Sequence, residues 1–131
     1  MDLPIIKAIY QRYNMDCGVA CLAMVCGVTY EAALVAVAQQ QPDVCASGVW
    51  TKHLVAGAKH LGFTLRKRQR FDLEADTGIL NVSSGLWHND HLVVLWEGRI
   101  IDTDAGLYMQ DVYFSINNAK ASALYVAERN T

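Results

Sequence analysis

Cys17 is the residue of this chain whose surroundings most favour chemical reactivity. It stands where a polar segment, ending in Asp16-Cys17-Gly18, gives way to an unbroken run of small and apolar residues. Asn14 or Asp16 can cap a helix that begins there, because a short side-chain oxygen accepts a hydrogen bond from an otherwise unpaired N–H. The positive end of the helix dipole then stabilises a thiolate. The same stretch fits the alternative equally well, in which Cys17 is a small buried core residue.

A thiolate nucleophile needs an imidazole that accepts and returns a proton, and a third group that orients the imidazole. Of the four histidines, His91 fits best, because it opens the apolar strand predicted for 91–96 and needs a polar partner there. A tight turn at Glu97-Gly98 folds the next strand back and puts Asp102 on the same face as His91. Asp102 is therefore the candidate orienting carboxylate. If His91 stood alone, a hairpin with a polar end would be the simpler interpretation.

The other histidines fit the role of the base less well. His53 and His60 lie on one face of a predicted helix with no acid beside them, a pattern more typical of a polar helix surface. His88 lies beside Trp87 in the polar loop before the strand, and Asp90 ends that loop. Trp87, His88 and Asp90 are therefore candidates for the border of a substrate groove.

Gln11 and the neighbours of the nucleophile complete the candidate site. The side-chain amide of Gln11 can reach back over the start of the helix, where it and the backbone N–H of Cys17 would form an oxyanion hole with two donors. Without that context, Gln11 would be an ordinary surface residue. Asp16 and Gly18, which flank Cys17, are expected to contact the substrate.

Length and composition predict one folded domain over 1–131. A chain of 131 residues that is 53% apolar and 18% charged can bury a hydrophobic core without the help of disulfide bonds or metals. The net charge of −2 gives no electrostatic footprint for nucleic acid, and the basic run 66–70 is better interpreted as the solvent face of a strand. No apolar run approaches the roughly 20 residues of a membrane span, and no secretory signal is visible. We therefore expect a cytoplasmic protein that neither binds nucleic acid nor inserts into a membrane.

The cysteines are expected to be reduced thiols and not metal ligands. Three of the four fall close together on one predicted helix, and the sequence contains no Cys-x-x-Cys and no His-x-x-x-His spacing. We therefore expect no metal and no cofactor.

Hydrophobic periodicity predicts helices first and strands afterwards. The helices are predicted at Cys17–Cys26 with Gly27 as C-cap, at Tyr30–Gln40 with Thr29 as N-cap, and at Trp50–Leu61, after a loop at 41–48. The strands are predicted at 63–71, 79–82, 91–96, 99–102 and 123–127, with an extended lead-in at 5–10 and a helical turn at 111–117. This order indicates an α+β domain, in which a helical layer packs on an antiparallel sheet.

The candidate residues lie in motifs that resemble a known family. Gln11-x4-Asp16-Cys17-Gly18-x-Ala20-Cys21-Leu22-Ala23-Met24 closely resembles the opening motif of the bacteriocin-processing, double-glycine leader peptidases. These are papain-like cysteine peptidases, often fused to peptide-exporting transporters. The resemblance continues through Gly48-x5-Leu54, Leu61-Gly62-Phe63, His91-Leu92-Val93-Val94-Leu95 and Ile100-Ile101-Asp102. It spans nearly the whole chain, with the motifs in the family's order.

The resemblance implies a role for each candidate residue. Cys17 would be the nucleophile, His91 the general base and acid, Asp102 the orienting carboxylate and Gln11 the oxyanion donor. It also implies a papain-like fold, with a helical half that carries the cysteine and a sheet half that carries the histidine. Family members typically cleave a peptide leader after a Gly-Gly pair.

Three features depart from the family's pattern. The proline that usually follows the aspartate is Thr103 here, and the hairpin that joins the histidine and aspartate strands is short. No transporter follows, so we expect a freestanding domain whose exporter is a separate partner. Three hypotheses stay open: a cysteine peptidase acting on a peptide or protein, a transglutaminase-like or acyltransferase-like enzyme with the same triad, and a catalytically silent domain that binds a leader or another peptide.

Overall fold

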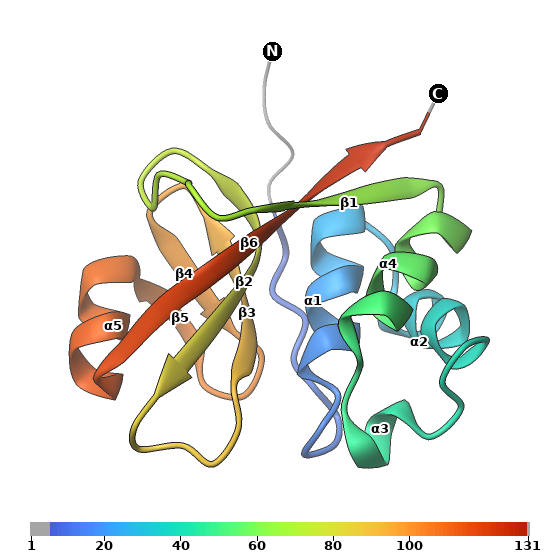
Figure 1. Ribbon diagram of the computed structural model, residues 1–131, viewed down its shortest axis with the longest axis horizontal. Coiled ribbons are helices and arrows are strands. Elements are labelled where there is room, and N and C mark those ends of the chain that lie inside the picture. Colours follow the sequence, from blue (N-terminus) through green and yellow to red (C-terminus); the bar gives the residue numbers. More distant parts are fainter. Residues whose placement is uncertain (1–5, 131) are drawn as a thin grey trace.

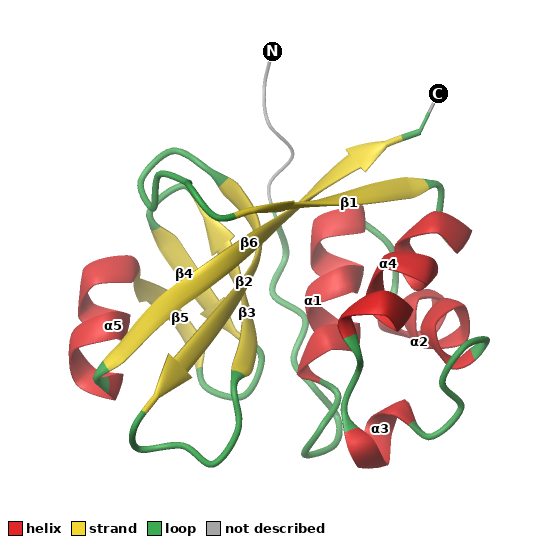
Figure 2. Ribbon diagram, in the orientation of Figure 1, coloured by secondary structure: helices red, strands yellow, loops and turns green. Residues whose placement is uncertain are grey.

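The computed structural model describes residues 6–130, and it places a group of helices beside a twisted sheet (Figure 1). Figure 2 shows that nearly all of the helical structure precedes the strands along the chain. The helices are α1 (Cys17–Cys26), α2 (Tyr30–Ala38), α3 (Val44–Ser47), α4 (Thr51–His60) and α5 (Gln110–Asn117). The strands are β1 (Phe63–Arg68), β2 (Thr77–Ser84), β3 (His91–Trp96), β4 (Arg99–Asp102), β5 (Gly106–Met109) and β6 (Ala119–Arg129). The predicted α+β class is confirmed.

Helix α1 is the central element of the fold. It packs against α2 and α4 on one side and against β3 on the other, and its residues 18–24 are all buried. A helix that is apolar around its whole circumference requires such burial. The helix ends at Cys26. The C-cap residue Gly27 follows with a φ of 66°, the left-handed conformation that glycine tolerates best. Because α1 packs between the other helices and the sheet, its first residue, Cys17, lies near the middle of the molecule.

The six strands form one antiparallel sheet in the order β1-β6-β2-β3-β4-β5. Alternate side chains enter two different cores. One core lies between the helices and the sheet and includes Val94 and Ile101, and the other lies between the sheet and α5 and includes Val93 and Ile100. In Figure 1, α5 lies on the opposite side of the sheet from α1 to α4. The sheet is therefore buried on both faces around the β3–β4 hairpin.

The β3–β4 hairpin has the register that the sequence predicts. Val94 lies opposite Ile101 and Trp96 opposite Arg99, so the turn is centred between Glu97 and Gly98. Both turn residues have positive φ, 45° and 85°, as a two-residue hairpin turn with the right twist requires. This register brings the end of β4 next to the start of β3.

Several boundaries differ from the predictions for physical reasons. The predicted loop 41–48 contains the short helix α3, and strand β6 begins at Ala119, earlier than expected. Strand β5 was not predicted, because its residues alternate only between half-buried and exposed positions and give no apolar pattern. Residues 6–10 form no strand, and Ile5, the first residue of the expected lead-in, lies outside the described residues.

Within residues 6–130, no single helix is long and apolar enough to cross a membrane. Among these residues, α1 and α2 reach that length and composition when they are counted as one segment, but the chain bends by 117° between the two helices.

Candidate active site

An open cavity of about 1010 Å³ lies between the helical part and the sheet. Its helical wall includes Met15, Cys17, Gly48, Val49 and Trp50, and its sheet wall includes Trp87, His88, Asp90, His91 and Asp102. The candidate nucleophile and the candidate base therefore face the same space from elements that are far apart in the sequence.

Cys17 is the first residue of α1 and is half-buried at the cavity. The preceding carbonyl, that of Asp16, accepts hydrogen bonds from Val19 N at 3.1 Å and Ala20 N at 3.2 Å, which starts the helix. The N–H groups of the first helical turn have no helical acceptors. Cys17 therefore carries a sulfur close to the positive end of a buried helix and an N–H free of the helical ladder.

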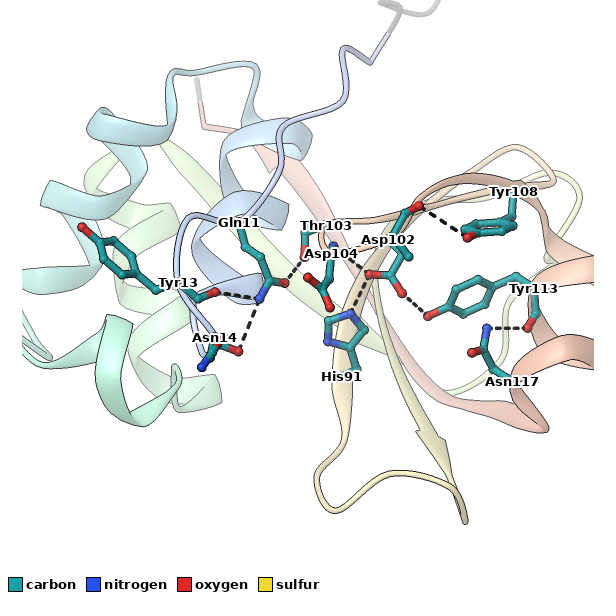
Figure 3. A network of polar contacts seen from close by, with 11 residues as sticks. Gln11, Tyr13, Asn14, His91, Asp102, Thr103, Asp104, Tyr108, Tyr113 and Asn117 are labelled. Atoms are coloured by element: carbon teal, nitrogen blue, oxygen red, sulfur yellow. Dashed lines mark hydrogen bonds and ion pairs between the residues drawn. The ribbon is translucent and has the colours of Figure 1, made fainter.

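His91 pairs with a carboxylate and faces the same cavity as the thiol. Its Nε2–H donates to Asp102 Oδ1 at 2.9 Å, as Figure 3 shows, and Cys17 lines the cavity together with His91. Since Nε2 is taken by the carboxylate, Nδ1 is left for the sulfur. The structure thus brings Cys17, His91 and Asp102 to one cavity, with His91 and Asp102 directly bonded.

Asp102 is held by more groups than the sequence predicted. Its Oδ2 accepts a hydrogen bond of 2.6 Å from the hydroxyl of Tyr113, and its Oδ1 also accepts one of 2.9 Å from Asp104 N. Tyr113 is 1% exposed and is the one buried residue of α5. Sequence reasoning missed Tyr113. The only available signal was its place as the buried position of a short helix, which does not name its partner.

These contacts decide the charge state of the site. Burial disfavours a charged ring, but the hydrogen bond to Asp102 and the nearby Cys17 sulfur raise the pKa of His91 to about 10. Burial likewise acts to raise the pKa of Asp102, but hydrogen bonds from His91 and Tyr113 hold that pKa below its ordinary value. Burial and the adjoining carboxylate raise the pKa of the Tyr113 hydroxyl, which stays protonated. At neutral pH the site therefore contains an imidazolium between a carboxylate and a sulfur.

Gln11 lies next to this group, but its amide is engaged by the protein itself. Its Nε2 donates to the carbonyl oxygens of Tyr13 at 2.8 Å and of Asn14 at 3.3 Å, in the turn that leads into α1. Its Oε1 accepts a hydrogen bond of 2.7 Å from the hydroxyl of Thr103. Figure 3 shows these contacts beside His91. Gln11 is not among the residues that line the cavity.

Asp16 and Gly18 are buried and do not line the cavity either. The prediction that the Asp16 side chain caps α1 is wrong, because this side chain makes no capping hydrogen bond. Its carboxylate instead accepts from Arg12 N at 2.9 Å, Tyr13 N at 3.0 Å and the hydroxyl of Tyr30 at 2.5 Å. Asp16 thus fixes the segment that carries Gln11, and it does not contact the open space where a substrate would lie.

Trp87, His88 and Asp90 do line the cavity. The Trp87 ring meets the His91 ring edge-on, with centroids 5.9 Å apart, and Asp90 Oδ2 accepts a hydrogen bond of 3.2 Å from Asn81. Across the cavity, the indole of Trp50 is 63% exposed. Aromatic side chains therefore stand on both walls.

His53 supports the helical wall of the cavity. Its Nδ1 lies 2.8 Å from Gln41 Oε1, which also accepts from Trp50 N at 3.1 Å. The amide nitrogen of Gln41 donates to the carbonyl of Gly48. His53 and the 6%-exposed Gln41 thus hold the loop 48–50 in place, so His53 has a structural partner that the sequence did not reveal.

The other cysteines differ from Cys17 in their surroundings. All four cysteines are free thiols, and no group of three or more metal-ligating side chains occurs within the described part of the chain. Burial raises the pKa of Cys21 well above its ordinary value and that of Cys26 to about 12. Cys45 lies half-buried with its sulfur 3.8 Å from the hydroxyl of Tyr30.

Comparison with known proteins agrees with this fold. A search of curated protein sequences finds no match, but two solved peptidase domains superimpose over most of the chain. One is a double glycine motif protease from an AMS/PCAT transporter in complex with the leader peptide, with 19% identity, a TM-score of 0.65, and coverage of 96% of this chain and 93% of that one. The other is the peptidase domain of Streptococcus ComA, a bifunctional ABC transporter involved in a quorum-sensing pathway, with 20% identity, a TM-score of 0.68, and coverage of 97% and 100%.

These similarities confirm the predicted papain-like fold, a helical half packed on an antiparallel sheet. The model of the peptidase C39 family matches residues 5–112, most of the chain. The resemblance that the opening motif indicates is therefore confirmed, and this chain belongs to the peptidase C39 family.

Proposed function

We propose that this protein is a cysteine peptidase that cleaves a peptide or protein through an acyl-enzyme on Cys17. The observation that carries the proposal is the position of His91, which lines the same cavity as Cys17 and donates to Asp102 Oδ1 at 2.9 Å. A nucleophile, a proton carrier and an orienting carboxylate in one cavity are the parts that such a reaction needs. Membership of the peptidase C39 family supports the same conclusion.

The geometry accounts for each step of hydrolysis. The Cys17 thiolate attacks the scissile carbonyl carbon, and the π electrons of that carbonyl move onto its oxygen. The protonated Nδ1 of His91 then gives its proton to the leaving amine as the C–N bond breaks, leaving a thioester on Cys17. In the second half, His91 takes a proton from water, hydroxide attacks the thioester, and the thiolate leaves. Asp102 keeps its charge throughout and stabilises the imidazolium.

The oxyanion would be bound by the Cys17 N–H and by the amide of Gln11. One hydrogen of that amide makes a good bond to Tyr13, whereas the contact of 3.3 Å with Asn14 is longer than the usual hydrogen bond. We propose that the oxyanion takes the hydrogen that faces Asn14. Catalytic hydrogen bonds often tighten only when substrate is bound, so this exchange would accompany substrate binding.

For the substrate we propose a leader peptide that ends in two small residues, with Gly-Gly as the first candidate. The support comes from the family and from the solved double glycine motif protease, which is in complex with a leader peptide. Trp87, His88 and Asp90 are then the residues that border the substrate on the sheet side. A separate peptide exporter is the corresponding partner.

The experiment is cleavage of a synthetic leader that ends in Gly-Gly, followed by mass spectrometry of the products. The parent protein should cut after the second glycine, and Cys17→Ala should not, whereas the matched control Cys45→Ala should cut at the parental rate. Binding without cleavage by the parent would favour the silent binding domain. Added amine distinguishes the remaining hypothesis, because an acyltransferase would give an amide product in place of the free acid.

A further inference from the structure

We propose that Thr103 is a positioning residue for the oxyanion donor Gln11. The segment 102–104 would then orient two side chains of the site, because Asp102 holds His91 and the adjacent Thr103 holds Gln11. This inference rests on the proposed function of Gln11, and it assigns a role to a residue that neither the cavity nor the triad includes.

Hydrogen bonds at both ends of the Gln11 amide carry the inference. The Thr103 hydroxyl donates to Gln11 Oε1 at 2.7 Å, which anchors the oxygen end of the amide on the side of β4. The nitrogen end must then point the other way, to the carbonyls of Tyr13 and Asn14 just before Cys17. The two ends of a glutamine amide have nearly the same size, so packing alone does not choose between them. The two carbonyls can only accept, so they select the orientation, and the Thr103 hydroxyl anchors the opposite end of the amide in it.

Burial protects the hydrogen bond between Thr103 and Gln11 and so the orientation of the Gln11 amide. Thr103 is 1% exposed and Gln11 is half-buried, so water has little access to replace the bond. If the amide rotated by half a turn, its oxygen would face the two carbonyl oxygens and its nitrogen would face the Thr103 hydroxyl. Such a rotation would lose the bonds to both carbonyls and place acceptors against one another. The hydroxyl of Thr103 therefore stabilises the orientation in which the Gln11 amide nitrogen faces the turn that leads into α1.

A main-chain contact brings the two segments together without setting the amide's orientation. Gln11 N donates to the carbonyl oxygen of Thr103 at 2.9 Å, and Asp104 N closes the turn onto Asp102 Oδ1. Figure 1 shows the segment before α1 passing between the helices and the sheet, where this contact forms. Any residue at position 103 can supply that carbonyl. Only a side-chain donor can also fix the amide, and the proline that the resembled family usually carries at this position has none.

The first experiment compares Thr103→Val, which keeps the shape and loses the donor, with Thr103→Ser, which keeps the donor. Removing an oxyanion donor costs about 10²–10³ in rate, and we expect Thr103→Val to lose about tenfold or more of kcat within that limit, at unchanged KM. Thr103→Ser should stay close to the parent. In a Gln11→Ala background, Thr103→Val should cause no further loss, because both changes remove the same interaction.

Two reagents separate positioning from general damage to the site. A peptide aldehyde forms a hemithioacetal whose oxygen occupies the oxyanion site, whereas iodoacetamide alkylates the sulfur without forming an oxyanion. We expect Thr103→Val to weaken aldehyde binding by the same factor as kcat and to leave the alkylation rate of Cys17 unchanged. Equal losses with both reagents, or losses that add to those of Gln11→Ala, would overturn the inference. So would full activity in Thr103→Val.

A spectroscopic measurement keeps this inference separate from the proposed function. In the parent, the side-chain amide protons of Gln11 should exchange slowly with solvent in NMR spectra, a protection that Thr103→Ser retains and Thr103→Val loses. If the parent cleaves no peptide, the proposed function fails, and the amide signals still decide whether Thr103 holds Gln11. If the parent is active and the signals are the same in Thr103→Val, only the role of Thr103 is refuted.

Discussion

Replacing Tyr113 by Phe removes a single hydroxyl from the far side of the active-site carboxylate. The hydroxyl donates to Asp102 Oδ2 at 2.6 Å, and the two residues are 1% and 6% exposed. In the variant, water cannot easily take the place of the lost donor. One oxygen of a buried carboxylate is then left without a partner, while His91 and Asp104 N still hold the other.

The cost follows from that geometry. A hydrogen bond to a charged group contributes about 1.5–3 kcal/mol net, and the upper part of that range applies when the remaining partner stays buried. We therefore expect Tyr113→Phe to lower the free energy of unfolding by about 2–3 kcal/mol at pH 7. Since Asp102 keeps its contact with His91, the effect on turnover should be smaller. About 1.4 kcal/mol of lost orientation in the transition state would lower kcat about tenfold.

Urea denaturation as a function of pH tests the electrostatic part of this reasoning. A carboxyl whose pKa is lowered by folding contributes stability above its ordinary pKa, and that contribution is lost as pH falls through the lowered pKa. Without the hydroxyl, the pKa of Asp102 is lowered less. The difference between parent and variant should therefore be full at neutral pH and narrow as pH falls below about 4.

Tyr108→Phe is the matched control for this variant. Its ring packs 5.5 Å from that of Tyr113, but its hydroxyl makes only a contact of 3.4 Å with the Ala105 carbonyl. It should change the free energy of unfolding by less than about 1 kcal/mol. Equal effects of the two changes, or a difference that does not vary with pH, would show that the Tyr113 hydroxyl does not stabilise the charge on Asp102.

Three further predictions test other parts of the site. Iodoacetamide should label Cys17 far faster than Cys21 at pH 7, as peptide mapping would show, because burial raises the pKa of Cys21 well above its ordinary value; equal rates would contradict an activated sulfur. The raised pKa of His91, about 10, predicts that kcat/KM falls on the alkaline side only near pH 10, and Asp102→Asn should move this fall to lower pH and reduce kcat by up to about 10⁴-fold. Asp16→Asn should lower the free energy of unfolding in urea by about 1.5–3 kcal/mol, because the fully buried carboxylate accepts three hydrogen bonds, and an unchanged midpoint would refute that account.

The part of the site that the sequence predicts well is the part that local rules determine. The run from Cys17 to Cys26 is apolar on every face, so it had to be a buried helix with its cysteine at the start. The turn at 97–98 leaves the hairpin only one register, which brought His91 and Asp102 to the same face. Short-range geometry was therefore enough to propose that pair, and the family resemblance supplied the link to Cys17.

What the sequence did not predict depends on contacts between distant segments. Nothing near Tyr113 indicates that its hydroxyl would meet Asp102, because α5 and β4 come together only through the fold. Asp16 has the composition of an N-cap, yet the Tyr30 hydroxyl and two backbone amides offer its carboxylate more hydrogen bonds than the helix start could. The bond between Gln11 and Thr103 joins residues 92 positions apart in the sequence in the same way.

The Cys17 sulfur and the His91 ring reach the cavity from different layers of the molecule. Cys17 is the first residue of α1, and His91 is the first residue of β3. Any partial opening that lets these layers separate also pulls the reacting atoms apart, long before the chain as a whole unfolds. Under the proposed mechanism, a nascent or damaged copy would therefore be unable to cleave its neighbours. The proposed activity would depend on completed docking of the helices on the sheet, and so on the integrity of the protein's own core.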